Sequence, residues 1–169
     1  METFFERIQE SAAVIEGTSF TVHKRPWGFS IALGTNVCIN SITGEPSTHF
    51  HRYRTEEYVL FSGQLTVWRG PHLEGDLEQT IAELVPTVMK PGDKILIPPN
   101  TVHIPLHVGP EAAIFFDIYH GEYVEEDVQR VYDKGSRDKA IAQKWAELGY
   151  KPGLSIVELI QATKRKLKK

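Results

Sequence analysis

Residues 47–63 read STHFHRYRTEEYVLFSG, and the spacing of polar side chains in this stretch indicates a metal site. Its two histidines, His49 and His51, are two positions apart. Because alternate residues of an extended segment point to the same side, both imidazoles can reach one point in space. Glu56 follows and adds a carboxylate. His103 comes much later, after another β-type run, so only a folded sheet can bring it to the other three residues.

Three imidazoles and one carboxylate form a donor set that suits a borderline divalent ion such as Mn, Fe, Co, Ni or Zn. Around an octahedral ion, four protein ligands leave two adjacent positions free for substrate oxygens or water. Cys38 is the only cysteine, so an intrachain disulfide and a thiolate zinc site are excluded. The sequence therefore predicts one divalent metal ion held by His49, His51, Glu56 and His103.

The chain has 169 residues, and its 41% hydrophobic and 24% charged residues are ordinary for a folded domain. From about residue 20 to residue 120, short β-type runs alternate with Gly, Pro and Asn. One long connection, residues 70–86, starts as a loop before a further strand. Many short strands at close spacing favour a sandwich or barrel over a parallel α/β sheet. The expected strands include 29–33, 37–42, 57–61, 64–68, 87–90, 94–97 and 113–119.

Helices are expected on both sides of this β region. Residues 3–16 have capping-box spacing at their start and helical periodicity along their length. Near the C-terminus, Ser136 is expected to cap one helix, and Ser155 with Glu158 forms a capping box for another. We therefore expect a single domain, 1–169, with helical extensions at 3–16 and 136–168.

Two motifs in the β region resemble the paired motifs of the cupin superfamily. The first is His49-x-His51-x4-Glu56-x6-Gly63, and the second is Gly92-x5-Pro98-x-Asn100-x2-His103. The resemblance implies an all-β cupin double-stranded β-helix, a jelly-roll barrel, with the metal inside two antiparallel sheets. Three positions depart from the usual pattern without removing a ligand: Gly44, which is one residue too close to the first histidine, Asn100, which replaces a glycine, and His107, which replaces an asparagine.

Two flanking segments resemble the cupin domain of type II mannose-6-phosphate isomerases, which occurs fused to mannose-1-phosphate guanylyltransferases. The sequence KRPWG at 24–28 resembles the opening of that domain, and GEYVEEDVQRVYD at 121–133 resembles its closing segment. The resemblance implies aldose–ketose isomerisation of a sugar or sugar phosphate. A divalent ion can bind the carbonyl and its neighbouring hydroxyl, and a general base then moves the proton between the two carbons. The metal motif is also similar to that of D-lyxose isomerase, a cupin that isomerises free sugars.

The general base remains open among three candidates, Asp117, Tyr58 and Glu57. Asp117 lies among apolar residues of the last expected strand, so it needs a polar partner or a cavity. Tyr58 shares the side of Glu56 on its strand, whereas alternation turns Glu57 away. The predicted substrate-binding cations, which would meet a phosphate or else lie on a solvated rim, are Arg52, Arg54 and Lys94.

Two other functions remain open. With Fe(II), the same donor set supports oxygen activation, as in cupin dioxygenases. A non-catalytic cupin would instead bind or sense a small molecule. Metal content combined with a sugar-isomerisation assay discriminates among the three functions.

The composition also bears on partners and location. The formal net charge of −3 disfavours a general nucleic-acid binder, and no apolar run approaches the roughly 18 residues of a membrane span. The acidic start lacks the basic region of a secretory signal, so a cytoplasmic protein with a small-molecule substrate is expected. The basic tail at 164–169 suits a solvated helix end. A homodimer is expected because cupins often cover their sheet edges by pairing.

Overall fold

The computed structural model describes residues 20–121 and 127–169. The helix predicted at 3–16 lies outside these residues, as do residues 122–126 of the segment that resembles the closing part of the isomerase domain.

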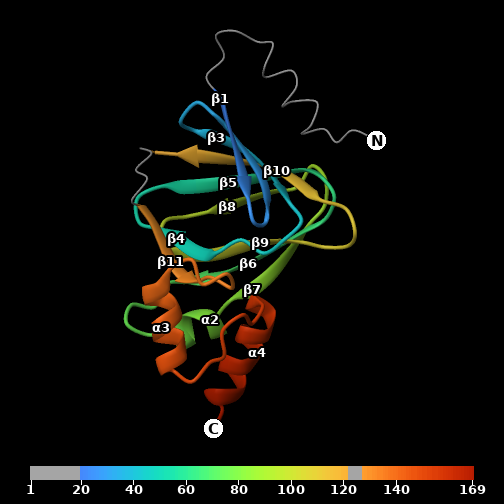
Figure 1. Cartoon of the computed structure of the whole chain (residues 1–169). Coiled ribbons are helices and arrows are strands. Elements are labelled where there is room, and N and C mark those ends of the chain that lie inside the picture. The colour runs from blue at the N-terminus through green and yellow to red at the C-terminus, as the bar shows by residue number, and fades with distance from the viewer. Residues whose placement is uncertain (1–19, 122–126) are drawn as a thin grey trace.

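Two antiparallel sheets form the body of the molecule (Figure 1). One has six strands in the order β1-β2-β3-β10-β5-β8, and the other has five in the order β11-β4-β9-β6-β7. Strands distant in sequence are therefore neighbours, and the predicted all-β jelly-roll architecture is confirmed. The strands are β1 (Phe20–Arg25), β2 (Gly28–Leu33), β3 (Val37–Ile42), β4 (Thr48–His51), β5 (Thr55–Ser62), β6 (Leu65–Pro71), β7 (Val85–Met89), β8 (Lys94–Ile97), β9 (Thr101–His107), β10 (Ala113–His120) and β11 (Val128–Tyr132).

Alternation along each strand decides which side chains fill the space between the sheets. On β5, Glu56, Tyr58 and Leu60 are buried, whereas the residues between them are only half-buried. Tyr58 and Leu60 join Phe115 of β10 and Val67 of β6 in one buried cluster. Burial of these apolar groups drives the two sheets together and leaves Glu56 as a carboxylate inside the barrel.

The expected strands agree with the observed ones within three residues, and the bounds of β3 and β8 coincide with the prediction. The structure adds β1, β4, β9 and β11 to the strands that the sequence analysis named. Strand β9 lies inside its sheet and carries Pro105, whereas proline is usually confined to edge strands, strand starts or bulges because it lacks the N–H of a ladder bond. Strand β4 is the extended segment whose alternation was expected to place His49 and His51 on one side.

The connection 70–86 contains a helix that the sequence did not reveal. Helix α2 (Leu77–Ala82) begins after Asp76, whose side chain accepts a hydrogen bond from the Gln79 N–H. Its buried residue Ile81 joins the apolar cluster on the outside of the five-stranded sheet. A helix of six residues is too short to establish helical periodicity, so the expectation of a loop before a strand missed it.

Two helices follow β11, as predicted: α3 (Lys139–Glu147) and α4 (Ile156–Lys166). The predicted capping box of Ser155 and Glu158 at the start of α4 is confirmed. The predicted cap of α3 at Ser136 is wrong, because Asp138 accepts the hydrogen bond from the Ile141 N–H. The helix therefore begins two residues later than expected, and the Asp138 carboxylate satisfies a free backbone donor of its first turn.

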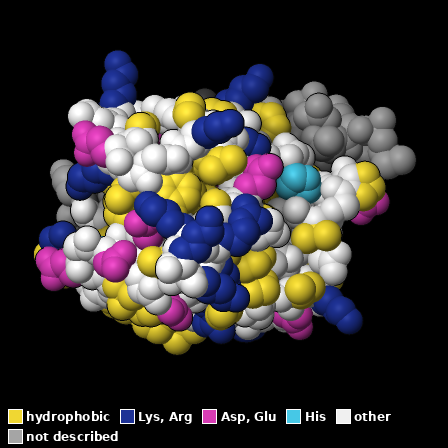
Figure 2. Space-filling model, turned by 90° about the horizontal axis from the view of Figure 1, so that it is seen from below, with side chains coloured by type: hydrophobic (Ala, Val, Ile, Leu, Met, Phe, Trp, Pro, Cys, Tyr) yellow, Lys and Arg dark blue, Asp and Glu magenta, His cyan; other side chains and the backbone are white. Residues whose placement is uncertain are grey.

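Both C-terminal helices cover the outer face of the five-stranded sheet (Figure 1). Trp145 of α3 is 3% exposed and donates its indole N–H to the Val131 carbonyl at 2.8 Å. Strand β11 pairs in turn with β4, which carries His49 and His51. The helical extension therefore supports the strand that holds two of the predicted ligands. The last turn of α4 has three basic residues. Lys and Arg side chains gather on the face of the molecule that is seen from below (Figure 2).

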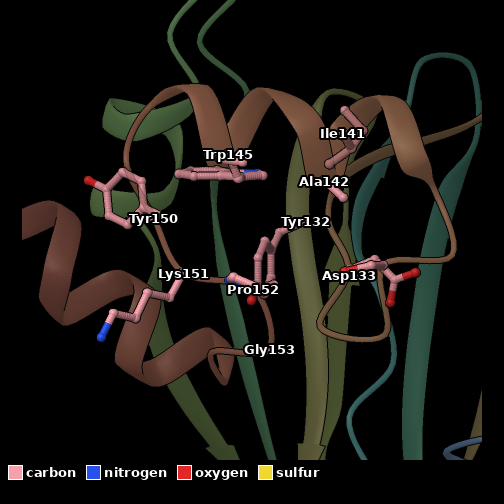
Figure 3. Close-up of a pocket in the computed structure, with 11 residues that line it drawn as sticks. Tyr132, Asp133, Ile141, Ala142, Trp145, Tyr150, Lys151, Pro152 and Gly153 are labelled. Carbon is pink, nitrogen blue, oxygen red and sulfur yellow. The ribbon is translucent and has the colours of Figure 1, made fainter.

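A small cavity of about 70 Å³ lies where α3 meets the turn before α4 (Figure 3). Trp145, Tyr150 and Tyr132 line it, and both tyrosine hydroxyls donate hydrogen bonds within the chain, to Glu78 and to the Leu154 carbonyl. This space is therefore a packing junction of the helical extension. No helix in the described residues is long and apolar enough to cross a membrane.

Candidate metal centre

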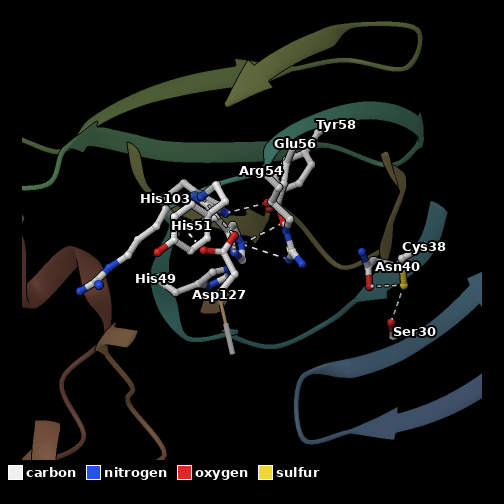
Figure 4. Close-up of polar contacts among 12 residues, drawn as sticks. Ser30, Cys38, Asn40, His49, His51, Arg54, Glu56, Tyr58, His103 and Asp127 are labelled. Atoms are coloured by element: carbon white, nitrogen blue, oxygen red, sulfur yellow. Dashed lines mark hydrogen bonds and ion pairs between the residues drawn. The ribbon is translucent and has the colours of Figure 1, made fainter. Parts of the chain in front are cut away.

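The four predicted ligand residues come from three strands and from both sheets. His49 and His51 lie on β4, and His49 is directly opposite His103 of β9 within the five-stranded sheet. Glu56 reaches the same point from β5 of the six-stranded sheet. Figure 4 shows the three rings and the carboxylate converging between the sheets.

One donor atom from each of the four residues lies within 4.8 Å of the others. Glu56 Oε1 is 2.9 Å from His51 Nε2, and Glu56 Oε2 is 3.0 Å from His103 Nε2. Around an octahedral ion with bonds of about 2.1 Å, adjacent donors are about 3.0 Å apart and opposite donors about 4.2 Å apart. The predicted convergence is therefore observed, and the cluster could hold one metal ion after small side-chain shifts.

Hydrogen bonds behind two of the rings fix which nitrogen faces the centre. Nδ1 of His49 is 2.9 Å from the Ser47 carbonyl oxygen, and Nδ1 of His103 is 2.9 Å from that of Thr101. A carbonyl oxygen only accepts, so each Nδ1 carries a proton and Nε2 is the nitrogen left to bind an ion. Nε2 of His103 has no hydrogen-bond partner among the described residues and lies 3.0 Å from Glu56 Oε2. Three imidazole nitrogens and a carboxylate that converge on one point form a donor set that fits a divalent ion.

Burial sets the charge states within the cluster. Burial, together with the neighbouring His103 and His51, holds the pKa of His49 well below its usual value, so this ring stays neutral at pH 7. Burial opposes ionisation of Glu56, but its contacts with His103 and His51 prevail and hold the pKa of this carboxyl well below its usual value. A neutral imidazole and an ionised carboxylate are the forms in which these groups bind a metal.

Arg54 is the cation closest to these donors. Its side chain is 5% exposed, and Nη2 and Nε donate to Glu56 Oε1 at 2.8 and 3.1 Å. Nη2 also lies 3.2 Å from His51 Nε2, and the guanidinium stacks 4.2 Å from the centre of the Tyr119 ring. Burial alone would lower the pKa of Arg54, but the Glu56 carboxylate raises it, so the guanidinium remains charged.

No protein-family model matches the chain, but part of it is similar to a curated protein. It is 30% identical over 109 residues to the mannose-1-phosphate guanylyltransferase RfbM of Salmonella typhimurium, which corresponds to 61% of this chain and 20% of RfbM. The chain therefore spans only a small part of this curated relative.

Two solved structures share the arrangement of its sheets. CapF of Staphylococcus aureus, a capsular polysaccharide assembling protein, superposes with a TM-score of 0.56 at 13% identity, over 75% of this chain and 38% of CapF. Drosophila melanogaster CENP-C, in a complex with CAL1, superposes with a TM-score of 0.52 at 12% identity, over 68% of this chain and 92% of CENP-C. The chain has the cupin fold.

The cupin barrel opens beside the cluster into a cavity of about 250 Å³, close to the lower end of the ~300–1,000 Å³ typical of ligand sites. His49 and Glu56 line this cavity, so two of the four predicted ligands border the space that a substrate would enter. Its polar wall comes mainly from the six-stranded sheet. The other polar residues that line the cavity are Arg25, Ser30, Asn40, Ser47, Arg54, Tyr58, Asp117, Tyr119, Arg130 and Arg137.

Two of the three candidate bases face this cavity. Asp117 is 7% exposed, and its Oδ1 has no hydrogen-bond partner among the described residues. Burial and the nearby charge of Glu56 raise the pKa of Asp117 well above its usual value. Tyr58 donates its hydroxyl to Glu56 Oε2 at 3.3 Å, and burial raises the pKa of its phenol, so it remains protonated.

The remaining candidates lie away from the cavity. Glu57 points to the opposite side of β5, where its carboxylate contacts His120 at 3.0 Å and Lys94 at 3.9 Å. The Lys94 side chain is 67% exposed. Arg52 is also exposed, and neither cation lines the cavity. Of the three predicted substrate-binding cations, the cupin barrel brings only Arg54 into the site.

Several cavity residues escaped the analysis of the sequence. Arg25 belongs to the KRPWG segment and Arg130 to the segment at 121–133, and both segments had been noted without a role for these side chains. Asn40 and Ser30 sit opposite each other on β3 and β2, where a buried polar residue between apolar neighbours was the available signal. Polar residues buried on an inner face need partners, and a cavity supplies space for them.

Proposed function

We propose that this cupin is a metal-dependent isomerase that interconverts an aldose, or its phosphate, with the corresponding 2-ketose. The observation that carries the proposal is one cavity that borders both the His/Glu cluster and the buried carboxyl of Asp117. An ion held by His49, His51, Glu56 and His103 would polarise the sugar carbonyl and its neighbouring hydroxyl.

Asp117 is the proposed proton carrier between C1 and C2 of the sugar. Because its pKa is raised, this carboxyl binds a proton more readily than an ordinary aspartate, which suits a group that takes up and returns a proton. The free Oδ1 leaves an oxygen available for this exchange. Tyr58 has a different proposed task, because its hydroxyl donates to Glu56 and so orients a ligand carboxylate.

The polar wall suits a polyol substrate. Asn40 accepts from the Cys38 thiol through Oδ1, at 3.7 Å, and its amide group borders the cavity. Ser30, whose hydroxyl contacts the same thiol at 2.8 Å, lies next to it. Hydroxyl and amide groups fixed in this way can read the hydroxyls of a sugar.

Arginines favour a phosphorylated form of the sugar. Arg25 and Arg130 are exposed and line the same cavity, away from the pairing of Arg54 with Glu56. Guanidinium groups bind phosphate through paired N–H donors. RfbM is by name a mannose-1-phosphate guanylyltransferase, so a phosphorylated mannose is the first compound to test.

The test begins with metal-free protein loaded separately with Mn, Fe, Co, Ni or Zn. Each form is incubated in deuterated water with mannose 6-phosphate, fructose 6-phosphate, mannose or lyxose, and deuterium at C2 is followed by NMR. The proposal expects ketose formation with C2 exchange in at least one pair. Asp117→Asn should lose turnover and still bind metal. The control is Asp93→Asn, which changes an exposed aspartate in the turn between β7 and β8 and should retain turnover.

Absence of C2 exchange under every metal would refute the isomerase. Oxygen consumption by the Fe(II) form would then support a dioxygenase. Tight binding of a sugar without turnover would support a non-catalytic cupin.

A further inference from the structure

A buried carboxylate outside the predicted ligand set stands next to the cluster. Asp127 lies immediately before β11, and the residue is 2% exposed. Its Oδ1 accepts the Arg52 N–H at 2.7 Å, and its Oδ2 accepts the Tyr53 N–H at 3.4 Å. Both donors belong to the turn between β4 and β5, which separates His51 from Glu56. Asp127 therefore fastens the turn between two of the predicted ligands.

The same carboxylate faces the back of the His51 ring. Nδ1 of His51 is 3.8 Å from Asp127 Oδ2, which is beyond hydrogen-bond distance, and Nδ1 has no hydrogen-bond partner among the described residues. On the other side of the ring, Nε2 faces the cluster, 2.9 Å from Glu56 Oε1 and 3.2 Å from Nη2 of Arg54. A histidine that binds an ion through Nε2 carries its proton on Nδ1. In a metal-bound centre the N–H of His51 would therefore face the carboxylate of Asp127.

His51 thus differs from the other two histidines. The rings of His49 and His103 are held from behind by backbone carbonyls, whereas the group behind His51 is a carboxylate. A carboxylate attracts the Nδ1 proton more strongly than a neutral carbonyl does, and it makes the Nε2 lone pair a better donor. Among the described residues two backbone N–H groups donate to this carboxylate, and a further N–H would reduce the free-energy cost of its burial.

We propose that Asp127 is a positioning residue of the metal centre, which holds His51 in the Nδ1–H tautomer with its Nε2 lone pair towards the ion. This inference rests on the metal-binding part of the proposed function and not on the sugar reaction. It can therefore be tested with metal alone.

The first experiment measures Zn²⁺ affinity by calorimetry for the wild type and Asp127→Asn. The asparagine keeps an oxygen that accepts the Arg52 N–H, so the turn is retained and only the charge behind His51 is lost. Loss of such a partner weakens metal binding by roughly 10–100-fold. Asp133→Asn is the matched control, because Asp133 is a buried carboxylate at the other end of β11 that accepts from Arg137 and Gly135. The control should bind Zn²⁺ with unchanged affinity.

The second experiment needs no variant and remains decisive if Asp127→Asn does not fold. Long-range ¹H–¹⁵N NMR of the Zn²⁺-loaded wild type reports the tautomer of each histidine. We expect a protonated Nδ1 and a metal-bound Nε2 at His51.

Three results would overturn the inference: a protonated Nε2 at His51, equal losses of affinity in Asp127→Asn and Asp133→Asn, or a wild type that binds no divalent ion. The last result would also remove the proposed function. A wild type that binds Zn²⁺ through His51 Nε2 but isomerises no sugar would leave the role of Asp127 standing and refute only the isomerase.

Discussion

Glu56→Gln should destabilise the metal-free protein, because Glu56 is the buried partner of Arg54. Nε and Nη2 of Arg54 both donate to Glu56 Oε1, and the two side chains are 5% and 2% exposed. The substitution keeps an oxygen acceptor but removes the negative charge. Arg54 then remains inside the barrel as a charge without its main counter-ion.

The magnitude follows from this geometry. Removing one partner of a buried ion pair costs about 3–5 kcal/mol, and the remaining amide oxygen favours the lower end, about 3 kcal/mol. For a chain of this length each kcal/mol corresponds to roughly 2–4 °C, so the melting temperature should fall by roughly 6–12 °C. Glu57→Gln on the same strand is the control, because its exposed contacts are worth less than about 1 kcal/mol.

The assay is urea unfolding in EDTA, followed by tryptophan fluorescence, for Glu56→Gln, Arg54→Met and the double variant. The double variant removes both charges, so its loss should be smaller than the sum of the two single losses by about 2 kcal/mol. Single losses that add within about 0.5 kcal/mol would show that the two side chains do not stabilise each other, and the argument from burial would be wrong.

Three further predictions concern the centre and the barrel. His51→Ala should lower Zn²⁺ occupancy, measured by metal analysis, and the melting temperature with Zn²⁺ should fall with it, because an ion that binds only the folded state stabilises that state. Asp117→Asn in EDTA should raise the melting temperature more at pH 8 than at pH 4. The folded-state pKa of Asp117 lies above its unfolded value, so the folded protein loses stability as the pH rises from the unfolded pKa towards the folded pKa. The substitution removes this loss, and an equal effect at both pH values would contradict the argument. Gly63→Ala should cost more than about 2 kcal/mol in urea unfolding, because its φ is +78° and a Cβ would lie 2.6 Å from the Ala112 carbonyl oxygen. A cost within about 0.5 kcal/mol would refute this account of the turn.

The candidate metal centre could be predicted from the sequence to an unusual degree. Alternation in an extended segment is a local property, and it placed His49 and His51 on one side before any fold was considered. The same rule separated Tyr58, which lies inside beside Glu56, from Glu57, which lies outside. The cupin motif supplied His103, which local geometry alone could not connect with the others.

The residues that line the cavity were harder to predict from the sequence. Arg52, Arg54 and Lys94 were chosen because they are near ligands in sequence, but only Arg54 turns inward. The arginines that do line the cavity, Arg25 and Arg130, come from opposite ends of the β region. Their approach depends on β1 and β11 being the outer strands of the two sheets, which no local pattern determines.

Periodicity, capping and spacing are short-range properties of the chain, and they were enough to predict the all-β class, the C-terminal capping box and the shared side of His49 and His51. The resemblance to the paired cupin motifs added His103. What surrounds the four side chains depends on tertiary contacts: the buried pairing of Arg54 with Glu56, the Asp117 oxygen that has no hydrogen-bond partner among the described residues and the place of Asp127 behind His51. Asp127 and His51 are 76 positions apart in sequence and meet only because β11 pairs with β4. Contacts of this kind depend on strand order and register, which the whole set of buried side chains selects together.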